Sequence, residues 1–342
     1  MITSIWSMKE HALLRKLISD NAIGSGNSKS ALITGSDGQD GKILTKKLIG
    51  QGYEVFGVTR RNLVQLLICL QSDGSQKILA EVNFGNITET NLILDSLRPD
   101  EIYHMAGVHS GSLTMRKLES SSFSQMEMVH VKFLENMINW MGKNSNSRLT
   151  CALSSQMYET LGKDRRVNSE TEPNPIGPYG NSKFEAFKRI KEAQISGLKV
   201  FGAILFNHTS QNSKSGFLMQ DIAKTIRQAN SRNNSQLLVM NKLAKLDISD
   251  AEEVCEGIIA LTRSAIPSSS VIGRGQLVTV EEIIREYFRI FVMREVAIIS
   301  NAESQKSAVF ADSREMSEKL GGWKVTKSPH QILADILAST NA

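Results

Sequence analysis

The sequence predicts an α/β protein built on a doubly wound parallel sheet. A glycine-rich turn, Gly35 to Gly41, lies between a short apolar strand at 31–34 and a helical run. Beyond it, strand-like apolar segments alternate with helical ones, an order that requires parallel strands joined by right-handed crossovers. The length of 342 residues suits one large α/β unit or two domains.

Composition excludes several classes of protein. Hydrophobic residues make up 41% and charged residues 22%, as in globular rather than disordered or repetitive chains. The net charge of +5 is spread without a run of five like charges, which argues against nucleic-acid binding. No apolar stretch approaches the ~18 residues of a membrane span. The cysteines are distant from one another and match no ligand spacing: Cys69, Cys151 and Cys255. We therefore expect a soluble cytoplasmic protein without a metal site.

Residues 1–30 predict an extension to this fold. Trp6, Leu13 and Leu17 have helical spacing, and a Gly/Ser/Asn-rich stretch follows at 24–30. Charged residues interrupt the apolar pattern, so a secretory signal is not predicted. We expect an amphipathic helix and a linker.

The segment from residue 31 has the order strand, glycine turn, helix and strand, with the second strand at 54–58. This βαβ unit binds dinucleotides, because its glycines allow a tight turn and let the backbone and the helix N–H groups approach a pyrophosphate. The residues that we expect to bind the cofactor are Gly35, Asp37, Gly38, Gln39, Asp40 and Gly41.

The end of the second strand indicates which dinucleotide is bound. NAD-binding proteins place an acidic residue there, whereas this chain has Arg60 and Arg61. A guanidinium pairs with a 2′-phosphate, which a carboxylate would repel. The sequence therefore predicts NADP, with one of the two arginines serving only as a solvated surface residue.

Later elements continue the alternation. Strands are expected at 81–84, 101–106 and 149–154, and helices at 89–97 and 124–141. The segment 62–77 is interpreted as a helix plus a loop.

A group of residues suited to acid–base chemistry follows. Tyr179 and Lys183 are four residues apart, which places them on one face of a helix. An ammonium group beside the phenol is expected to lower the pKa of Tyr179 from ~10 toward neutrality. Ser154 ends a strand, where ligands of open α/β sheets bind, and its hydroxyl could bond the same reacting oxygen.

With these residues assembled, the chain resembles the extended short-chain dehydrogenase/reductase family, and within it the GDP-mannose 4,6-dehydratase group. The resemblance runs from about residue 31 to the C-terminus. It rests on the glycine turn, the arginine pair, Tyr179 to Lys183, and the segments 98–106, 204–208 and 312–323.

The resemblance implies a Rossmann domain that binds NADP at 31–205. Residues 206–342 would form mainly a substrate domain, with some segments returning to the Rossmann domain. It implies that Tyr179 deprotonates a sugar hydroxyl while hydride passes to NADP, that Lys183 holds the ribose, and that Ser154 bonds the sugar oxygen. Asn207 would contact the substrate diphosphate, although a strand-end cap is the alternative. His208 is interpreted as structural.

The chain departs from the family pattern at Gln156, where the dehydratases carry the glutamate that removes the C5 proton. An amide is no general base near neutral pH, so the elimination step is in doubt while hydride transfer is not. His130 replaces an asparagine and is a possible substitute acid/base, although a lone histidine on a helix is more often structural. Leu246 and Ile176 replace arginines, which suggests a changed substrate.

Three functions remain open at this point. The first is a nucleotide-sugar dehydratase, with the sugar linked to GDP as the resemblance implies. The second is a reductase or epimerase that uses only the Tyr, Lys and Ser machinery. The third is a non-catalytic NADP-binding descendant. The resemblance also implies a homodimer or homotetramer.

Overall fold

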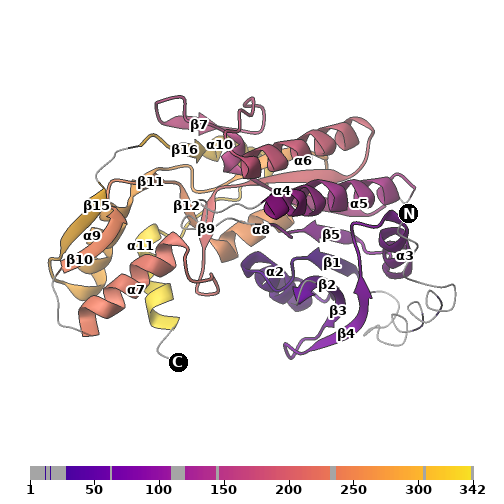
Figure 1. Ribbon diagram of the computed structural model, residues 1–342, viewed down its shortest axis with the longest axis horizontal. Coiled ribbons are helices and arrows are strands. Elements are labelled where there is room, and N and C mark those ends of the chain that lie inside the picture. Colours follow the sequence, from indigo (N-terminus) through magenta and orange to yellow (C-terminus); the bar gives the residue numbers. More distant parts are fainter. Residues whose placement is uncertain are drawn as a thin grey trace.

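The computed structural model describes residues 12, 16, 28–61, 64–108, 120–143, 146–231, 236–302 and 306–339. The helix and linker expected over residues 1–30 lie almost entirely outside these ranges. Figure 1 shows a larger part built around one sheet and a smaller part that contains α7, α9, α11, β10 and β15.

The larger part is organised by an eight-stranded sheet in the order β13-β8-β6-β5-β1-β2-β3-β4. Its first six strands are parallel, which confirms the predicted fold class. Their bounds are β13 Ser269–Ile272, β8 Val200–Leu205, β6 Arg148–Ser154, β5 Glu101–His104, β1 Ser30–Thr34 and β2 Glu54–Arg61. The chain order reverses direction around β1, so a crevice at the carboxyl ends of β1 and β5 is expected.

The edge of the sheet corrects the sequence analysis. The helix and loop expected within 62–77 are wrong, because β3 (Val64–Leu70) and β4 (Gln76–Val82) form an antiparallel hairpin there. Asp73 and Gly74 are the turn residues between two apolar runs, a strong hairpin signal. Gly74 has φ +84°, and the Ser75 N–H donates to the Asp73 carboxylate at 2.8 Å.

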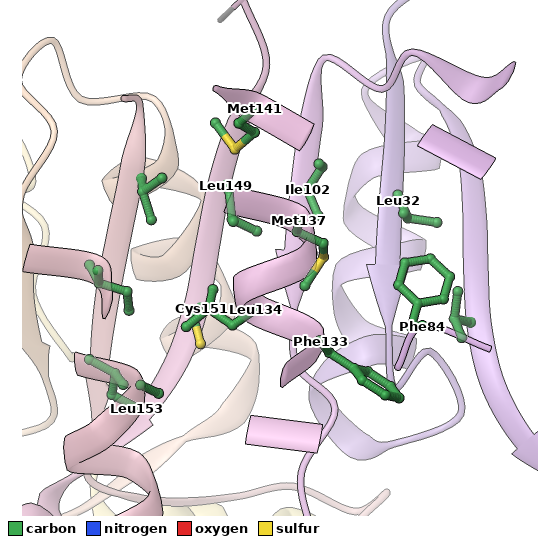
Figure 2. Packing of buried hydrophobic residues seen from close by; sticks show 14 of the residues in the cluster. Leu32, Phe84, Ile102, Phe133, Leu134, Met137, Met141, Leu149, Cys151 and Leu153 are labelled. Atoms are coloured by element: carbon green, nitrogen blue, oxygen red, sulfur yellow. The ribbon is translucent and has the colours of Figure 1, made fainter. Parts of the chain in front are cut away.

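Helices cover both faces of the sheet. One face packs against α3 (Ile87–Leu97), α5 (Phe133–Met141) and α6 (Pro178–Ile195), and the other against α2 (Gln39–Gly50) and α8 (Ala251–Thr262). Figure 2 shows Leu134 and Met137 of α5 lying over Leu149 and Cys151 of β6. In the sequence, α4 (Ser120–Met126) is followed by a π-helical turn, η2 (Glu127–Lys132), which leads directly into α5.

The smaller part has its own core. Strands β10 (Gln236–Asn241) and β15 (Ala297–Ala302) pair in parallel, and three helices bury apolar side chains against them: α7 (Leu218–Ser231), α9 (Val280–Tyr287) and α11 (Pro329–Ala338). A π-helical turn, η4 (Phe288–Val292), ends α9. Between these elements the chain returns to the larger part, because α8 and β13 pack on the main sheet.

Short elements join the two parts. Three two-stranded pairs lie between them, namely β7 (Arg165–Val167) with β16 (Val309–Ala311), β9 (Asn207–Thr209) with β12 (Ile248–Asp250), and β11 (Lys245–Leu246) with β14 (Val278–Thr279). The 3₁₀ turn η3 (Ser155–Met157) follows β6, and α10 (Ser313–Lys319) follows β16. Within the ranges given above, no helix has the length and apolarity to cross a membrane.

Candidate active site

A cavity of about 1100 Å³ opens at the carboxyl ends of the parallel strands. Its walls come from the glycine turn, the ends of β2 and β6, the start of α6, the segment 205–219 and β11. Ligands of doubly wound sheets bind at this edge. The expected cofactor and catalytic residues lie along this one cavity, except for Arg61.

The glycine turn has the geometry that a dinucleotide needs. The Gly35 N–H donates to the Val58 carbonyl at 2.7 Å, which ties the turn to β2, and α2 begins at Gln39. The first N–H groups of a helix lack intrahelical partners and attract phosphate. A Cβ on Gly41 would lie 2.3 Å from the Gly35 carbonyl oxygen, so the tight turn requires glycine there.

We therefore expect Gly41→Ala to lower stability by about 1–3 kcal/mol, the usual cost of overpacking, and to weaken dinucleotide binding. Gly50→Ala is the matched control, because Gly50 lies at the other end of the same helix. Apart from its chain neighbours and its own helix backbone, a Cβ there would meet no described atom within 4 Å. This control should leave binding unchanged and raise stability by about 0.5–1 kcal/mol. Thermal unfolding and NADP titration measure both effects, and equal behaviour of the two variants would contradict the packing argument.

The two arginines of β2 occupy different places. Arg60 is exposed and lines the cavity. Arg61 instead donates to the Gln76 side chain at 2.5 Å and lies 3.9 Å from the Asp37 carboxylate. Asp37 also accepts a 2.5 Å hydrogen bond from the Thr59 hydroxyl. Of the two arginines, only Arg60 lines the cavity.

Ser154, Tyr179 and Lys183 meet at the end of β6. Tyr179 and Lys183 lie in the first turns of α6, and Tyr179 forms a hydrogen bond with Ser154. The Lys183 ammonium is buried, donates to the Ala152 carbonyl at 2.8 Å, and lies 5.8 Å from the Tyr179 ring centroid. Burial lowers the pKa of Lys183.

The pKa of Tyr179 differs from the sequence expectation. Burial raises it above its usual value, and the hydrogen bond with Ser154 opposes that rise only in part. The predicted lowering toward neutrality by Lys183 is therefore wrong for the protein alone, because desolvation of the phenolate outweighs it. At neutral pH Tyr179 is a protonated phenol, a form that donates a proton.

Gln156 lies on η3 and is exposed to the cavity. Its backbone N–H donates to the Ser154 hydroxyl at 3.2 Å, which places Gln156 next to the site formed by Ser154 and Tyr179. The position that the family reserves for a base thus faces the cavity with an uncharged side chain.

His130 is built into the protein interior. It is fully buried on η2, and its Nε2 accepts a 3.0 Å hydrogen bond from the Val108 N–H. Its Nδ1 lies 2.8 Å from the Ser182 hydroxyl, which in turn donates to the Tyr179 carbonyl. Both ring nitrogens are engaged and the ring does not line the cavity, so His130 supports the start of α6 rather than replacing the missing base.

Of the remaining expected residues, some line the cavity and one does not. Asn207 and Leu246 line it, whereas Ile176 is 76% exposed and lies outside the lining. His208 forms an ion pair with Asp40 at 3.0 Å. Lys214 and Lys245 also line the cavity. They were not predicted, because a lone lysine in a loop or short strand belongs to no recognisable motif.

Comparison with known proteins gives consistent results. Residues 32–329 match the family described as GDP-mannose 4,6 dehydratase. GDP-mannose 4,6 dehydratase 2 of Arabidopsis thaliana is 27% identical over 265 residues, covering 74% of this chain and 70% of the relative. The human GDP-mannose 4,6 dehydratase is 26% identical, covering 78% and 75%.

Solved structures agree on the fold. RMD from Pseudomonas aeruginosa, determined in complex with NADPH, superposes with a TM-score of 0.69 at 18% identity and covers 91% of this chain and 98% of its own. The match to the family extends over the glycine turn, the site at the end of β6 and most of the smaller part. The chain therefore belongs to the GDP-mannose 4,6 dehydratase family, as its sequence motifs indicate.

Proposed function

We propose that the protein is an NADP-dependent enzyme that transfers hydride at C4 of a nucleotide sugar without completing a dehydration. The observation that carries this proposal is the site at the end of β6. Ser154, Tyr179 and Lys183 are assembled there, while the neighbouring cavity position holds Gln156.

The residues present fit a nicotinamide dinucleotide. The turn before α2 has no space for a side chain at Gly41, and the start of the helix offers N–H groups to a pyrophosphate. Arg60 would pair with the 2′-phosphate and Lys183 with the ribose. When bound, NADPH supplies the hydride for this reaction.

The protein's own residues supply the proton. Tyr179 is a neutral phenol, so it can hydrogen-bond a 4-keto oxygen and protonate it as the alkoxide forms. Ser154, bonded to Tyr179, would hold the same oxygen. The buried Lys183 ammonium stabilises the phenolate that remains. This arrangement favours reduction of a keto sugar, and the same groups in reverse oxidise a hydroxyl.

Elimination would need a base that the described cavity lining does not offer. Its carboxylates are Asp37 and Asp40, and its imidazole is His208. Asp37 is bonded to Thr59, and Asp40 is paired with His208. Each of these groups is held by a partner, so we expect none of them to take the place of the missing glutamate.

The far end of the cavity supports an anionic substrate. Lys214 is exposed and Lys245 is partly exposed, and both line the cavity. Lys245 contacts Asp164 at 2.7 Å, which leaves Lys214 as the described cation best placed for a diphosphate. Family membership favours a GDP-linked sugar, and we expect the enzyme to act as a homodimer or homotetramer.

Deuteride transfer tests the proposal. The full-length protein is incubated with NADPH deuterated at C4 and with a panel of GDP-, CDP-, UDP- and dTDP-linked 4-keto sugars, and the products are analysed by mass spectrometry. We expect deuterium at sugar C4 in one nucleotide series and no product that has lost water. Absence of deuterium from every sugar would favour a non-catalytic NADP-binding protein.

Dehydration is the second candidate function, because the family match covers residues 32–329. Loss of water from GDP-mannose in the presence of NADP would support it. That result would require a proton acceptor other than Gln156.

Cofactor choice gives a further prediction. Arg60→Ala should weaken NADP binding by about 1.5–3 kcal/mol, the usual contribution of a hydrogen bond to a charged group, and should leave NAD binding nearly unchanged. Arg61→Ala is the matched control, because Arg61 is paired with Gln76 and lies outside the cavity lining. Calorimetric titration with both dinucleotides measures the effect, and equal affinities of the wild type for NADP and NAD would overturn the assignment.

A further inference from the structure

The start of α2 uses its backbone and its side chains on different partners. Gln39 and Asp40 are the first residues of this helix, where backbone N–H groups lack intrahelical acceptors and attract a pyrophosphate. Their side chains bond instead to the segment 206–213, which follows β8 and carries Asn207. The same two residues therefore connect the side of the cavity formed by the glycine turn with the side formed by segment 206–213.

The first of these contacts is an ion pair between Asp40 and His208. The His208 Nε2–H lies 3.0 and 3.1 Å from the two Asp40 oxygens, and Nδ1–H donates to the Phe206 carbonyl at 2.7 Å. Burial lowers the pKa of His208, but the Asp40 charge and these hydrogen bonds outweigh burial and raise it to about 9. His208 is thus an imidazolium that holds the segment beside Asn207 against the helix.

The second contact is made by Gln39. Its Oε1 accepts hydrogen bonds from the Ser210 N–H at 3.0 Å and from the Ser213 hydroxyl, and its Nε2 donates to Asp40 at 3.0 Å. The Gln39 amide therefore links the Asp40–His208 ion pair to Ser210 and Ser213, at the C-terminal end of segment 206–213. Asn207 and Ser213 line the cavity, and Lys214 follows directly.

We propose that Gln39, Asp40 and His208 couple the binding of the dinucleotide to the binding of the nucleotide sugar, with His208 as the positioning residue. A dinucleotide that orders the start of α2 also orders segment 206–213, and a nucleotide sugar held by that segment orders the helix start in return. By thermodynamic reciprocity each ligand tightens the other by the same factor. This inference rests on the proposed function for the identity of the second ligand.

Calorimetry on the full chain tests the coupling. The affinity for NADP is measured with and without saturating GDP, and the affinity for GDP with and without saturating NADP. In the wild type each should tighten the other roughly fivefold or more, as is typical of coupled sites. His208→Asn should bring this factor to about one, because asparagine can still bond the Phe206 carbonyl but is too short to reach Asp40.

The matched control is Arg263→Gln, which removes the 2.9 Å ion pair between Arg263 and Glu101 outside the cavity lining. It should lower stability and keep the coupling factor of the wild type. If His208→Asn does not fold, Ser213→Ala removes one bond to Gln39 and should reduce the factor in part. If His208→Asn, or Ser213→Ala in its place, folds and keeps the wild-type coupling factor, the proposal is overturned.

Hydrogen exchange separates this inference from the proposed function. NADP alone should slow amide exchange in residues 206–213 of the wild type and not of His208→Asn. Failure of GDP to bind would contradict a GDP-linked substrate and leave this second measurement to decide the coupling. Absence of NADP-induced protection in the wild type would overturn it.

Discussion

Tyr179→Phe should lower the rate of hydride transfer by about 10²–10⁴-fold, the usual contribution of a positioned acid or base, and leave the affinity for NADP unchanged. The substitution removes only the hydroxyl that bonds Ser154 and would protonate the sugar oxygen. Single-turnover rates with deuterated NADPH and the keto sugar that the deuteride-transfer panel identifies measure the effect, and titration measures NADP binding separately.

Tyr158→Phe is the matched control for this experiment. Tyr158 lines the same cavity, but its buried hydroxyl has no hydrogen-bond partner among the described residues. Loss of that hydroxyl should leave hydride transfer at the wild-type rate. Lys183→Met should lower both the rate and the affinity for NADP, because we propose that the ammonium stabilises the Tyr179 phenolate and also holds the ribose. A Tyr179→Phe enzyme with the wild-type rate would show that another group supplies the proton.

Gln156→Glu should introduce an elimination step that we expect the wild type to lack. With GDP-mannose and NADP the wild type should form little or no 4-keto-6-deoxy product, because an amide does not accept the C5 proton. A carboxylate at this exposed position of the cavity wall should raise the yield by about 10²–10⁴-fold, the range of general base catalysis, if the sugar is bound. Mass spectrometry detects the loss of water.

Gln156→Ala provides the comparison, since it opens the same space without adding a base and should form no more product than the wild type. Rapid dehydration by the wild type would refute the argument, and His130 would not explain it, because both of its ring nitrogens are engaged. A Gln156→Glu enzyme that transfers hydride but forms no dehydrated product would show that the substrate contacts also differ.

Local patterns allowed correct predictions wherever one turn or one helix face determines the geometry. The glycine turn lies between β1 and α2 as expected, and Tyr179 and Lys183 share the first turns of α6. The hairpin of β3 and β4 was missed because its apolar runs also fit a helix, although Asp73 and Gly74 carried the turn signal.

Properties that depend on burial could not be predicted from spacing. The four-residue interval placed Lys183 beside Tyr179 but gave no account of desolvation, which has the largest effect on the pKa of the Tyr179 phenol. Likewise, the neighbours Arg60 and Arg61 are equivalent in sequence, and only the position of Gln76 on β4 separates their roles. The partner of His208 is 168 residues away, beyond the reach of any local pattern.

The return of α8 and β13 to the main sheet has a consequence for how the chain folds during synthesis. Strand β8 pairs with β13, and Val254 and Ile258 of α8 cover one face of the sheet. A chain released up to residue 205 would leave β8 as an open edge above an uncovered apolar surface, which favours aggregation. We therefore expect chains that end before residue 272 to aggregate or to depend on chaperones to remain in solution.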